Sequence, residues 1–204
     1  MYDPITIAGQ ETTATTLRWA LLFMTLHPDV QTKVQHEIDA NIGYERAISY
    51  ADRSQLPYVE SVLQEVMRFA ATVPSPNRRA IRDFKLGQYE VKANTILTMN
   101  LYGIFRDPRV WNDPTHFNPD ANFPPDGSKQ NAAVEHLLPF GIGKRVCLGE
   151  TLARQEIFLF FVGLMRAFRV EADPNLSLPP EDIGTPGITR GPLSFKIQFI
   201  SRSK

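Results

Sequence analysis

The segment Pro139–Glu150, PFGIGKRVCLGE, contains the only cysteine in a chain of 204 residues. Glycines at positions 141, 143 and 149 surround this Cys147, and the cations Lys144 and Arg145 precede it. Glycine permits tight turns and a close approach of the backbone to a ligand. Neighbouring cations favour the thiolate form of a cysteine, which is the form that binds metals and acts as a nucleophile. The segment therefore raises the question of whether Cys147 is reactive or structural.

Two further features of the segment bear on that question. The residues after it predict a strongly apolar helix from about Leu148, which would put Cys147 at a helix N-terminus, where unpaired N–H groups favour an anion. The ring of Phe140 would shield the sulfur from water. The alternative is an inert, buried cysteine beside a glycine turn, which is the commoner role of a lone cysteine. Together the features favour a thiolate that binds the iron of a flat macrocycle.

The composition is that of a soluble globular protein, with 43% hydrophobic and 22% charged residues. The formal net charge is zero, which argues against nucleic acid or an anionic membrane as an electrostatic partner. A single cysteine excludes an internal disulfide and any zinc or iron–sulfur site that needs several thiolates. The longest apolar runs, ALLFMTL and IFLFFVGLM, are too short to span a bilayer, so we expect no membrane segment in this chain.

Apolar periodicity and proline positions predict a mainly α fold with small β-sheets. Helices are expected over 4–27, 28–41 and 56–70, with prolines in their first turns. The stretch VPSPNRRA is interpreted as a turn-rich break, and short strands with a short helix ending near Phe105 follow it. The proline-rich residues 107–139 show no period and predict a long irregular loop. A helix over 148–169 and a tail of short strands and turns complete the chain.

The cysteine segment resembles a known signature. Phe140, Gly143, Arg145, Cys147 and Gly149 match F-x-x-G-x-R-x-C-x-G, the haem-binding pattern of the haem-thiolate monooxygenases, the cytochrome P-450 family. From average residue usage, a chance match of all five is about one in ten thousand. The resemblance implies that Cys147 ligates the iron of haem b and donates electron density that favours O–O cleavage. It also implies that Arg145 pairs with a haem propionate, and that Gly141 belongs to the same cofactor loop, 140–149.

A second match lies in the helix predicted over 56–70. Glu65 and Arg68 are three residues apart and therefore share one face, where a surface ion pair worth a few tenths of a kcal/mol would explain them. They also resemble the family's E-x-x-R, a structural ion pair beneath the haem. The family completes this pair with an arginine in P-E-R-F. Here the run Phe117–Phe123 has alanine or asparagine at that place and one inserted residue, so we expect the pair to lack its third partner.

The first predicted helix carries a third match, AGQETT, which is similar to the family's A-G-x-E-T-T on the helix that crosses the distal haem face. A glycine inside a helix costs about 1 kcal/mol relative to alanine, and the resemblance explains Gly9 as room for dioxygen and substrate. It implies that Thr12 and Glu11 organise the water that delivers protons, a role akin to general acid catalysis. The alternative is that the threonines of this helix lie on a solvated face.

The resemblance covers nearly the whole chain but only the C-terminal half of the family's domain. Arg79, in a stretch similar to R-x-T-x-D, would bind the second propionate, although a solvated basic cluster is an alternative. We therefore expect a single partial domain over 1–204. Its parts are the distal oxygen-binding helix (4–27), the helix with E-x-x-R (56–70), the proline-rich meander (107–139), the cysteine ligand loop (140–149) and the proximal helix (148–169).

The implied reaction inserts one oxygen atom of O2 into a small apolar organic substrate. NADPH would supply electrons through a reductase that docks on the basic proximal face near Lys144. The motif style resembles microsomal members, which implies the endoplasmic reticulum membrane, with the cytoplasm as the alternative for the chain as written. Two other hypotheses remain: a non-catalytic fragment that binds haem weakly or only binds partners, and a helical interaction module without a cofactor. The sequence does not identify the substrate.

Overall fold

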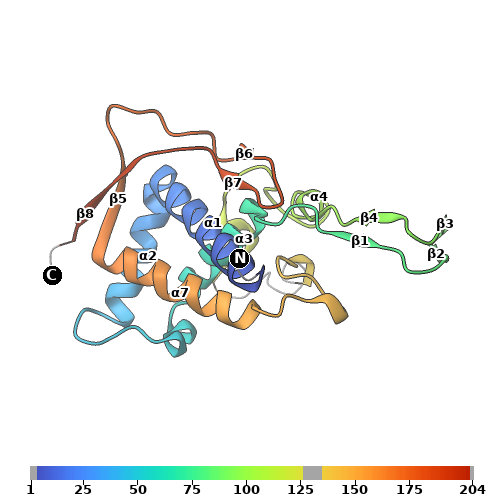
Figure 1. The fold of residues 1–204 in the computed structure, drawn as a ribbon. Helices are drawn as coiled ribbons and strands as arrows, with labels where there is room; N and C mark the ends of the chain where they lie inside the picture. The colour runs from blue at the N-terminus through green and yellow to red at the C-terminus, as the bar shows by residue number, and fades with distance from the viewer. Residues whose placement is uncertain (1–3, 126–134, 203–204) are drawn as a thin grey trace.

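The computed structural model describes residues 4–125 and 135–202. Its longest helices are α1 (Pro4–Leu26), α2 (Pro28–Asn41), α3 (Pro57–Ala70) and α7 (Glu150–Ala167). Helix α1 packs against α2, α3 and α7, and α2 packs against α3 and α7, so these helices form one bundle (Figure 1). The predicted fold class, mainly α with small sheets, is confirmed.

Local signals set the helix boundaries. Pro28 and Pro57 occupy the first turns of α2 and α3, where the missing N–H costs nothing. Helix α2 stops before Gly43, whose φ of +64° suits glycine. Helix α3 ends at Ala70, and its C-cap residue Ala71 adopts a left-handed conformation with φ +43°. The ranges predicted for the first three helices are therefore correct to within one residue at each end.

The main hydrophobic core lies between these helices. Trp19 and Phe23 of α1 stack with ring centroids 5.3 Å apart, and Phe23 stacks on Phe117 at 4.6 Å. Val34 and Ile38 of α2 are fully buried against them, as the four-residue period predicts. Burying one such side chain stabilises the fold by roughly 1.5–3 kcal/mol.

The strands form two-stranded antiparallel sheets. Strand β1 (Asn77–Arg79) pairs with β4 (Ile96–Thr98), and β2 (Phe84–Leu86) with β3 (Tyr89–Val91). These two pairs extend away from the helices as an arm (Figure 1). Strand β5 (Phe168–Ala172) pairs with β8 (Ile197–Ser201), and β6 (Gly184–Thr185) with β7 (Gly191–Pro192).

The prediction of a turn-rich break at VPSPNRRA is wrong for its last part, because β1 occupies Asn77–Arg79. Local composition there favours a turn, but the partner strand supplies the backbone hydrogen bonds from about twenty residues away, with Asn77 opposite Thr98 and Arg79 opposite Ile96. Sequence-local signals cannot detect such a partner.

The short helices lie in the connections. They are η1 (Tyr50–Gln55), α4 (Leu101–Ile104), α5 (Pro119–Asn122) and η2 (Gly143–Arg145). The meander predicted as an irregular loop over 107–139 contains α5 and is well packed. Trp111 and Phe123 are buried with Phe105 in a second core cluster, and Leu137 packs against it. The part of the predicted loop at 126–134 lies outside the described residues.

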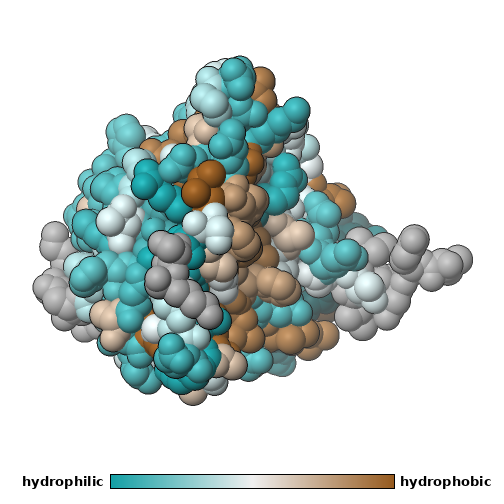
Figure 2. All heavy atoms as spheres, turned by 90° about the vertical axis from the view of Figure 1, so that its left-hand side faces the viewer, coloured by the Kyte–Doolittle hydropathy of each residue, from teal (hydrophilic) through white to brown (hydrophobic). Residues whose placement is uncertain are grey.

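Helix α7 is shorter than predicted, spanning Glu150–Ala167 instead of 148–169. Gly149 occupies the position before its first turn, and β5 begins at Phe168 because pairing with β8 extends the backbone there. Apolar side chains form a band on one face of the molecule (Figure 2). On α7, Phe160 is 59% exposed and Leu152 60%. Among the helices of the described residues, none is long and apolar enough to cross a membrane.

Candidate functional site

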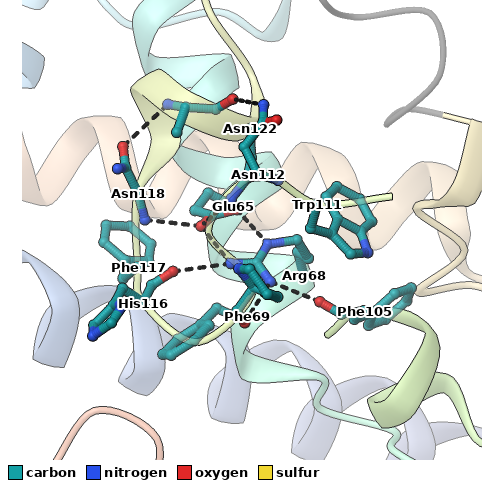
Figure 3. A network of polar contacts seen from close by, with 12 residues as sticks. Glu65, Arg68, Phe69, Phe105, Trp111, Asn112, His116, Phe117, Asn118 and Asn122 are labelled. Atoms are coloured by element: carbon teal, nitrogen blue, oxygen red, sulfur yellow. Dashed lines mark hydrogen bonds and ion pairs between the residues drawn. The ribbon is translucent and has the colours of Figure 1, made fainter. Parts of the chain in front are cut away.

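Glu65 and Arg68 form a buried ion pair on α3 (Figure 3). Both side chains are 0% exposed. Arg68 donates from Nε to Glu65 Oε2 and from Nη2 to Oε1, each over 2.6 Å. The alternative of a surface pair is therefore wrong, and the predicted pairing of these residues is confirmed.

Arg68 also holds the chain segment that crosses above α3. Its Nη1 donates to the carbonyl oxygens of Phe105 at 2.6 Å and Pro114 at 3.2 Å, and its Nη2 donates to that of His116 at 3.0 Å. The guanidinium carbon lies 5.3 Å from the centre of the Trp111 ring. One buried cation thus ties α3 to the end of α4 and to two points of the meander, which is a structural and not a catalytic arrangement.

The expectation that the pair lacks a third partner is wrong. Asn122 at the end of α5 is 2% exposed and donates from Nδ2 to Glu65 Oε1 over 3.1 Å. The backbone N–H of Asn118 donates to the same oxygen over 2.9 Å. Burial raises the pKa of Glu65, and the donors on Arg68, Asn118 and Asn122 oppose that rise. The inserted residue in Phe117–Phe123 hid this match, although an asparagine directly before Phe123 was the visible signal.

The cysteine loop, residues 140–149, has a defined backbone. The N–H of Cys147 donates to the carbonyl of Phe140 over 2.9 Å, which closes the loop. Gly141 and Gly143 have φ angles of +78° and +72°, which other residues rarely adopt. The glycine pattern of the segment is thus explained by backbone geometry at these two positions.

Two expectations for the thiol differ from the structure. Cys147 is exposed, so Phe140 does not shield it within this chain. The Phe140 ring instead lies 4.7 Å from the guanidinium carbon of Arg154, which also pairs with Glu150. Helix α7 begins three residues after Cys147, because Cys147–Gly149 form a turn in which the Glu150 N–H donates to the Cys147 carbonyl over 3.4 Å. The favourable effect of the helix N-terminus on a thiolate is correspondingly weaker than expected.

The surroundings of Cys147 fit a haem. Leu148 is 100% exposed, Ile142 72% and Val146 41%, so the thiol stands among accessible apolar side chains. Arg145, two residues before it, is exposed and available to a carboxylate. A soft thiolate donor, an apolar rim and a cation match the iron, the macrocycle and a propionate of haem, respectively.

The residues of the third motif lie on the first turns of α1. Thr12 donates from Oγ1 to the carbonyl of Ala8 over 2.8 Å, and Thr15 donates from Oγ1 to Glu11 Oε1 over 3.4 Å. Thr13, Thr15 and Thr16 are buried, so the alternative of a solvated threonine face is wrong for these three. A Cβ on Gly9 would meet no atom within 4 Å. The roles of Thr12 and Glu11 remain predictions.

Arg79 lies exposed on β1, and its contact with a propionate remains a prediction. A hydrogen-bonded pair that sequence reasoning missed is that of His27 and Glu181, with Nε2 and Oε2 2.5 Å apart. Glu181 Oε1 also accepts the N–H of Phe117 over 3.3 Å. No local signal could have found this pair, since its members are 154 residues apart in sequence. Within the described residues, no group of three or more His, Cys, Asp or Glu side chains could hold a metal ion.

The chain is similar in sequence to proteins of known family. A family model described as Cytochrome P450 matches residues 2–199. The chain is 40% identical over 198 residues to Cytochrome P450 2U1 of Mus musculus, covering 96% of this chain and 37% of that protein. It is 37% identical over 194 residues to Steroid 17-alpha-hydroxylase/17,20 lyase of Squalus acanthias, covering 94% and 38%.

A solved structure, described as zebra fish cytochrome P450 with progesterone, superposes with a TM-score of 0.83 at 35% sequence identity. The superposition covers 96% of this chain and 43% of that one. The chain thus spans well under half the length of the relatives that it matches.

Proposed function

The chain belongs to the cytochrome P450 family, and from this premise we propose that it is the haem-binding part of a haem-thiolate monooxygenase. The observation that carries the proposal is the cysteine loop. Cys147 is exposed there at the end of a backbone turn that needs two left-handed glycines, with the apolar rim of Ile142, Val146 and Leu148 beside it. Bound haem supplies the redox chemistry by which one oxygen atom of O2 enters an organic substrate.

Residues of the cysteine loop, together with Arg79 on β1, would hold haem b. Cys147 ligates the iron as a thiolate, and Arg145 binds one propionate while Arg79 on β1 binds the other. Gly141 and Gly143 provide the left-handed backbone conformations of the loop, and Gly149 is the N-cap residue of α7. Phe140 accepts the N–H of Cys147 at its backbone carbonyl and so closes the loop. Its ring is held by Arg154, whose guanidinium carbon lies 4.7 Å away.

Protons are handled on α1. Thr12 and Glu11 would organise the water that supplies protons where haem is bound. The Oγ1 hydroxyl of Thr12 donates to the carbonyl of Ala8; a χ1 rotation would release it to a water. Glu11 Oε1 accepts the hydroxyl of Thr15 over 3.4 Å, which holds this carboxylate one turn away from Thr15 on α1. The open space beside Gly9 supports room for a ligand at this point.

The relatives support a substrate and partner class. One relative is named for steroid hydroxylation, and one similar solved structure contains progesterone. We therefore propose a small apolar organic substrate. Electrons from NADPH would arrive through a reductase that docks near Lys144. The relation to microsomal-type members supports the endoplasmic reticulum membrane as the location.

The proposed activity is tested with the haem-loaded chain, a NADPH-dependent reductase, isotope-labelled dioxygen and progesterone as the probe substrate. The expected result is incorporation of one labelled oxygen atom into the product, and its loss in Cys147→Ser. The matched control is Ser201→Ala, a conservative change at the end of β8, remote in sequence from the cysteine loop.

A second candidate is a non-catalytic fragment that binds haem or a partner. The chain covers 37% of one relative's length, and apolar side chains of α7 are exposed. This candidate predicts haem binding that depends on Cys147 without any labelled product. Labelled product in that assay with the wild-type chain, lost with Cys147→Ser, would rule it out.

A further inference from the structure

We infer that Thr72 is a positioning residue for the distal motif on α1, residues 8–13, which it holds through the hydroxyl of Thr16. The inference deepens the proposed function and rests on it, because this motif is the part of α1 that would organise water beside haem. The contact that carries the inference joins Thr16 Oγ1 and Thr72 Oγ1 over 3.0 Å, between residues 56 positions apart in the chain. Neither threonine belongs to the motif itself.

The direction of this hydrogen bond follows from the other contact of Thr16. The Oγ1 hydroxyl of Thr16 donates to the backbone carbonyl of Thr12 over 2.9 Å. A hydroxyl carries one hydrogen, so the hydrogen between the two threonine side chains must belong to Thr72. The order of donation is therefore Thr72 to Thr16 to the carbonyl of Thr12. Because a carbonyl oxygen has no hydrogen to pass on, this chain of bonds fixes the backbone of α1 and does not relay a proton.

The backbone of Thr72 is held independently of its hydroxyl. Its carbonyl accepts the N–H of Arg190 over 2.8 Å, and the carbonyl of Arg190 accepts the indole N–H of Trp19 over 2.9 Å. Nη1 of the buried Arg190 also donates to the carbonyl of Ala70, the last residue of α3, over 2.6 Å. The end of α3 and the segment before β7 thus meet on α1, against which both α3 and β7 pack (Figure 1). Thr72 is therefore a fixed point from which α1 can be held.

The motif lies on the less buried part of α1. Residues 8–11 are exposed, whereas Trp19 and Phe23 are fully buried in the main core. The side-chain hydrogen bonds of Glu11 and Thr12 are made within α1, and glycine at position 9 lowers the helix propensity there. Such a helix end opens more easily than a buried middle. Thr16 lies between the two parts, so its bond from Thr72 stabilises the turn that carries the motif.

The test uses Thr72→Val and Thr16→Val in the full chain without haem, because valine keeps the shape of threonine and removes the hydroxyl. The matched control is Thr25→Val on the same helix. Thr25 donates from Oγ1 to the carbonyl of Leu21 over 2.8 Å, so it repeats the bond that Thr16 makes within α1 but not the one to Thr72. The measurements are hydrogen exchange of the backbone N–H groups of α1 and the urea unfolding equilibrium.

We expect Thr72→Val to raise the exchange rates of residues 12–16 by about threefold or more relative to those of residues 19–26. Because Thr72 is not part of α1, a purely local role of its hydroxyl would change exchange only in the bend after α3. Thr72→Ser keeps the hydroxyl and should retain the exchange rates of the wild type, as should Thr25→Val at residues 12–16. In the double variant of Thr16 and Thr72, the unfolding constant should rise by about twofold or more less than the product of the two single effects.

A second measurement uses the haem-loaded chain with the reductase and labelled dioxygen. Thr72→Val should lower the labelled product formed per NADPH consumed by about threefold or more, since a displaced motif organises water less well. The absorption spectrum of its reduced carbon monoxide complex should stay unchanged, because Cys147 is not affected. Thr25→Val should match the wild type in both respects.

Unchanged exchange at residues 12–16 in Thr72→Val, or an equal rise in Thr25→Val, would overturn the inference. Faster exchange in Thr72→Val together with a wild-type yield of product would overturn it too, because the motif would then tolerate the displacement. Absence of labelled product from the wild-type chain would instead contradict the proposed function, and the exchange rates of the haem-free chain would then decide whether Thr72 holds the motif.

Discussion

The Glu65–Arg68 network and the cysteine loop differ in how completely the chain satisfies them. Both members of the ion pair are 0% exposed, and each polar end meets partners from α3, α5 or the meander. Cys147 and its neighbour Leu148 are exposed instead, and the hydrogen bonds of the loop are those that shape its backbone. The hydrogen-bonding groups of the Glu65–Arg68 network find partners within the chain, whereas the cysteine loop exposes its thiol to solvent.

This difference separates a structural role, that of the buried pair, from the cofactor-binding role proposed for the cysteine loop. Buried, fully bonded charges specify one arrangement of the backbone, and removing one partner leaves the other unpaired at high cost. An exposed thiol on a fixed loop contributes little to folding and is free to bind. The chemistry is therefore expected to reside in the part of the molecule that stability depends on least.

The largest effect is expected from Arg68→Ala. It leaves the Glu65 carboxylate buried without its cation and releases the backbone carbonyls of Phe105, Pro114 and His116, so we expect a loss of about 3–5 kcal/mol in the free energy of unfolding. Urea denaturation measures it, with Arg53→Ala on η1 as the control, because Arg53 is half-exposed and should lose about 1 kcal/mol or less. Comparable losses in the two variants would remove the distinction between the regions.

A smaller effect separates two glycines. Gly143 has φ +72°, so Gly143→Ala should destabilise the chain by about 1–2 kcal/mol through backbone strain, although a Cβ there would meet no atom within 4 Å. Gly9→Ala on α1 should stabilise it by up to about 1 kcal/mol, since helical alanine is favoured over glycine and the site is open. Thermal unfolding of both variants checks the opposite signs; the same sign in both would show that the loop geometry is not enforced.

The stabilisation by the contact between Glu181 and His27 is expected to depend on pH. Burial raises the pKa of Glu181, but the bond and charge of His27 and the Phe117 N–H outweigh it and leave the pKa below its usual range. Glu181→Gln should therefore cost about 1 kcal/mol near neutral pH.

The sign of this pH dependence follows from the lowered pKa. The stabilisation by Glu181 is complete above the unfolded pKa of about 4.3. It is lost as the pH falls through the lower folded pKa. The difference between wild type and Glu181→Gln should thus vanish in acid, and a difference that persists after the carboxyl is protonated would contradict this assignment.

The smallest effect is expected at the thiol itself. Cys147 is exposed and its side chain fills no core, so Cys147→Ser should change the stability of the haem-free chain by less than about 0.5 kcal/mol. Chemical denaturation of the two proteins side by side measures this. A loss of several kcal/mol would mean that the sulfur has a packing role and would revive the interpretation of an inert structural cysteine.

The sequence predicted what depends on neighbouring residues. Pro28, Pro57 and the period of Val30, Val34 and Ile38 are local signals, and α2 and α3 follow them. The five residues of the cysteine signature lie within ten positions, so the motif was visible directly. Strand β1 and the third partner of Glu65 were missed because each depends on a segment distant in sequence, namely Ile96–Thr98 and Asn122.

Exposure was the other quantity that the sequence could not provide. The sequence of the helix is compatible with either an exposed or a buried Glu65–Arg68 pair. The pair is buried because Trp111 and the meander pack over α3. The shielding of Cys147 was predicted from the nearness of Phe140 in sequence, but the side chain of Phe140 turns to Arg154. Direction of a side chain depends on tertiary contacts that a linear pattern does not contain.

The central claim is that Cys147 is a thiolate ligand of haem iron, and the absorption spectrum of the haem-supplied, reduced chain under carbon monoxide tests it most directly. The account predicts a strongly red-shifted Soret band in the wild-type chain and its loss in Cys147→Ala, with the stability of the haem-free chain unchanged. An ordinary, unshifted band, or a red-shifted band that persists in Cys147→Ala, would contradict the claim.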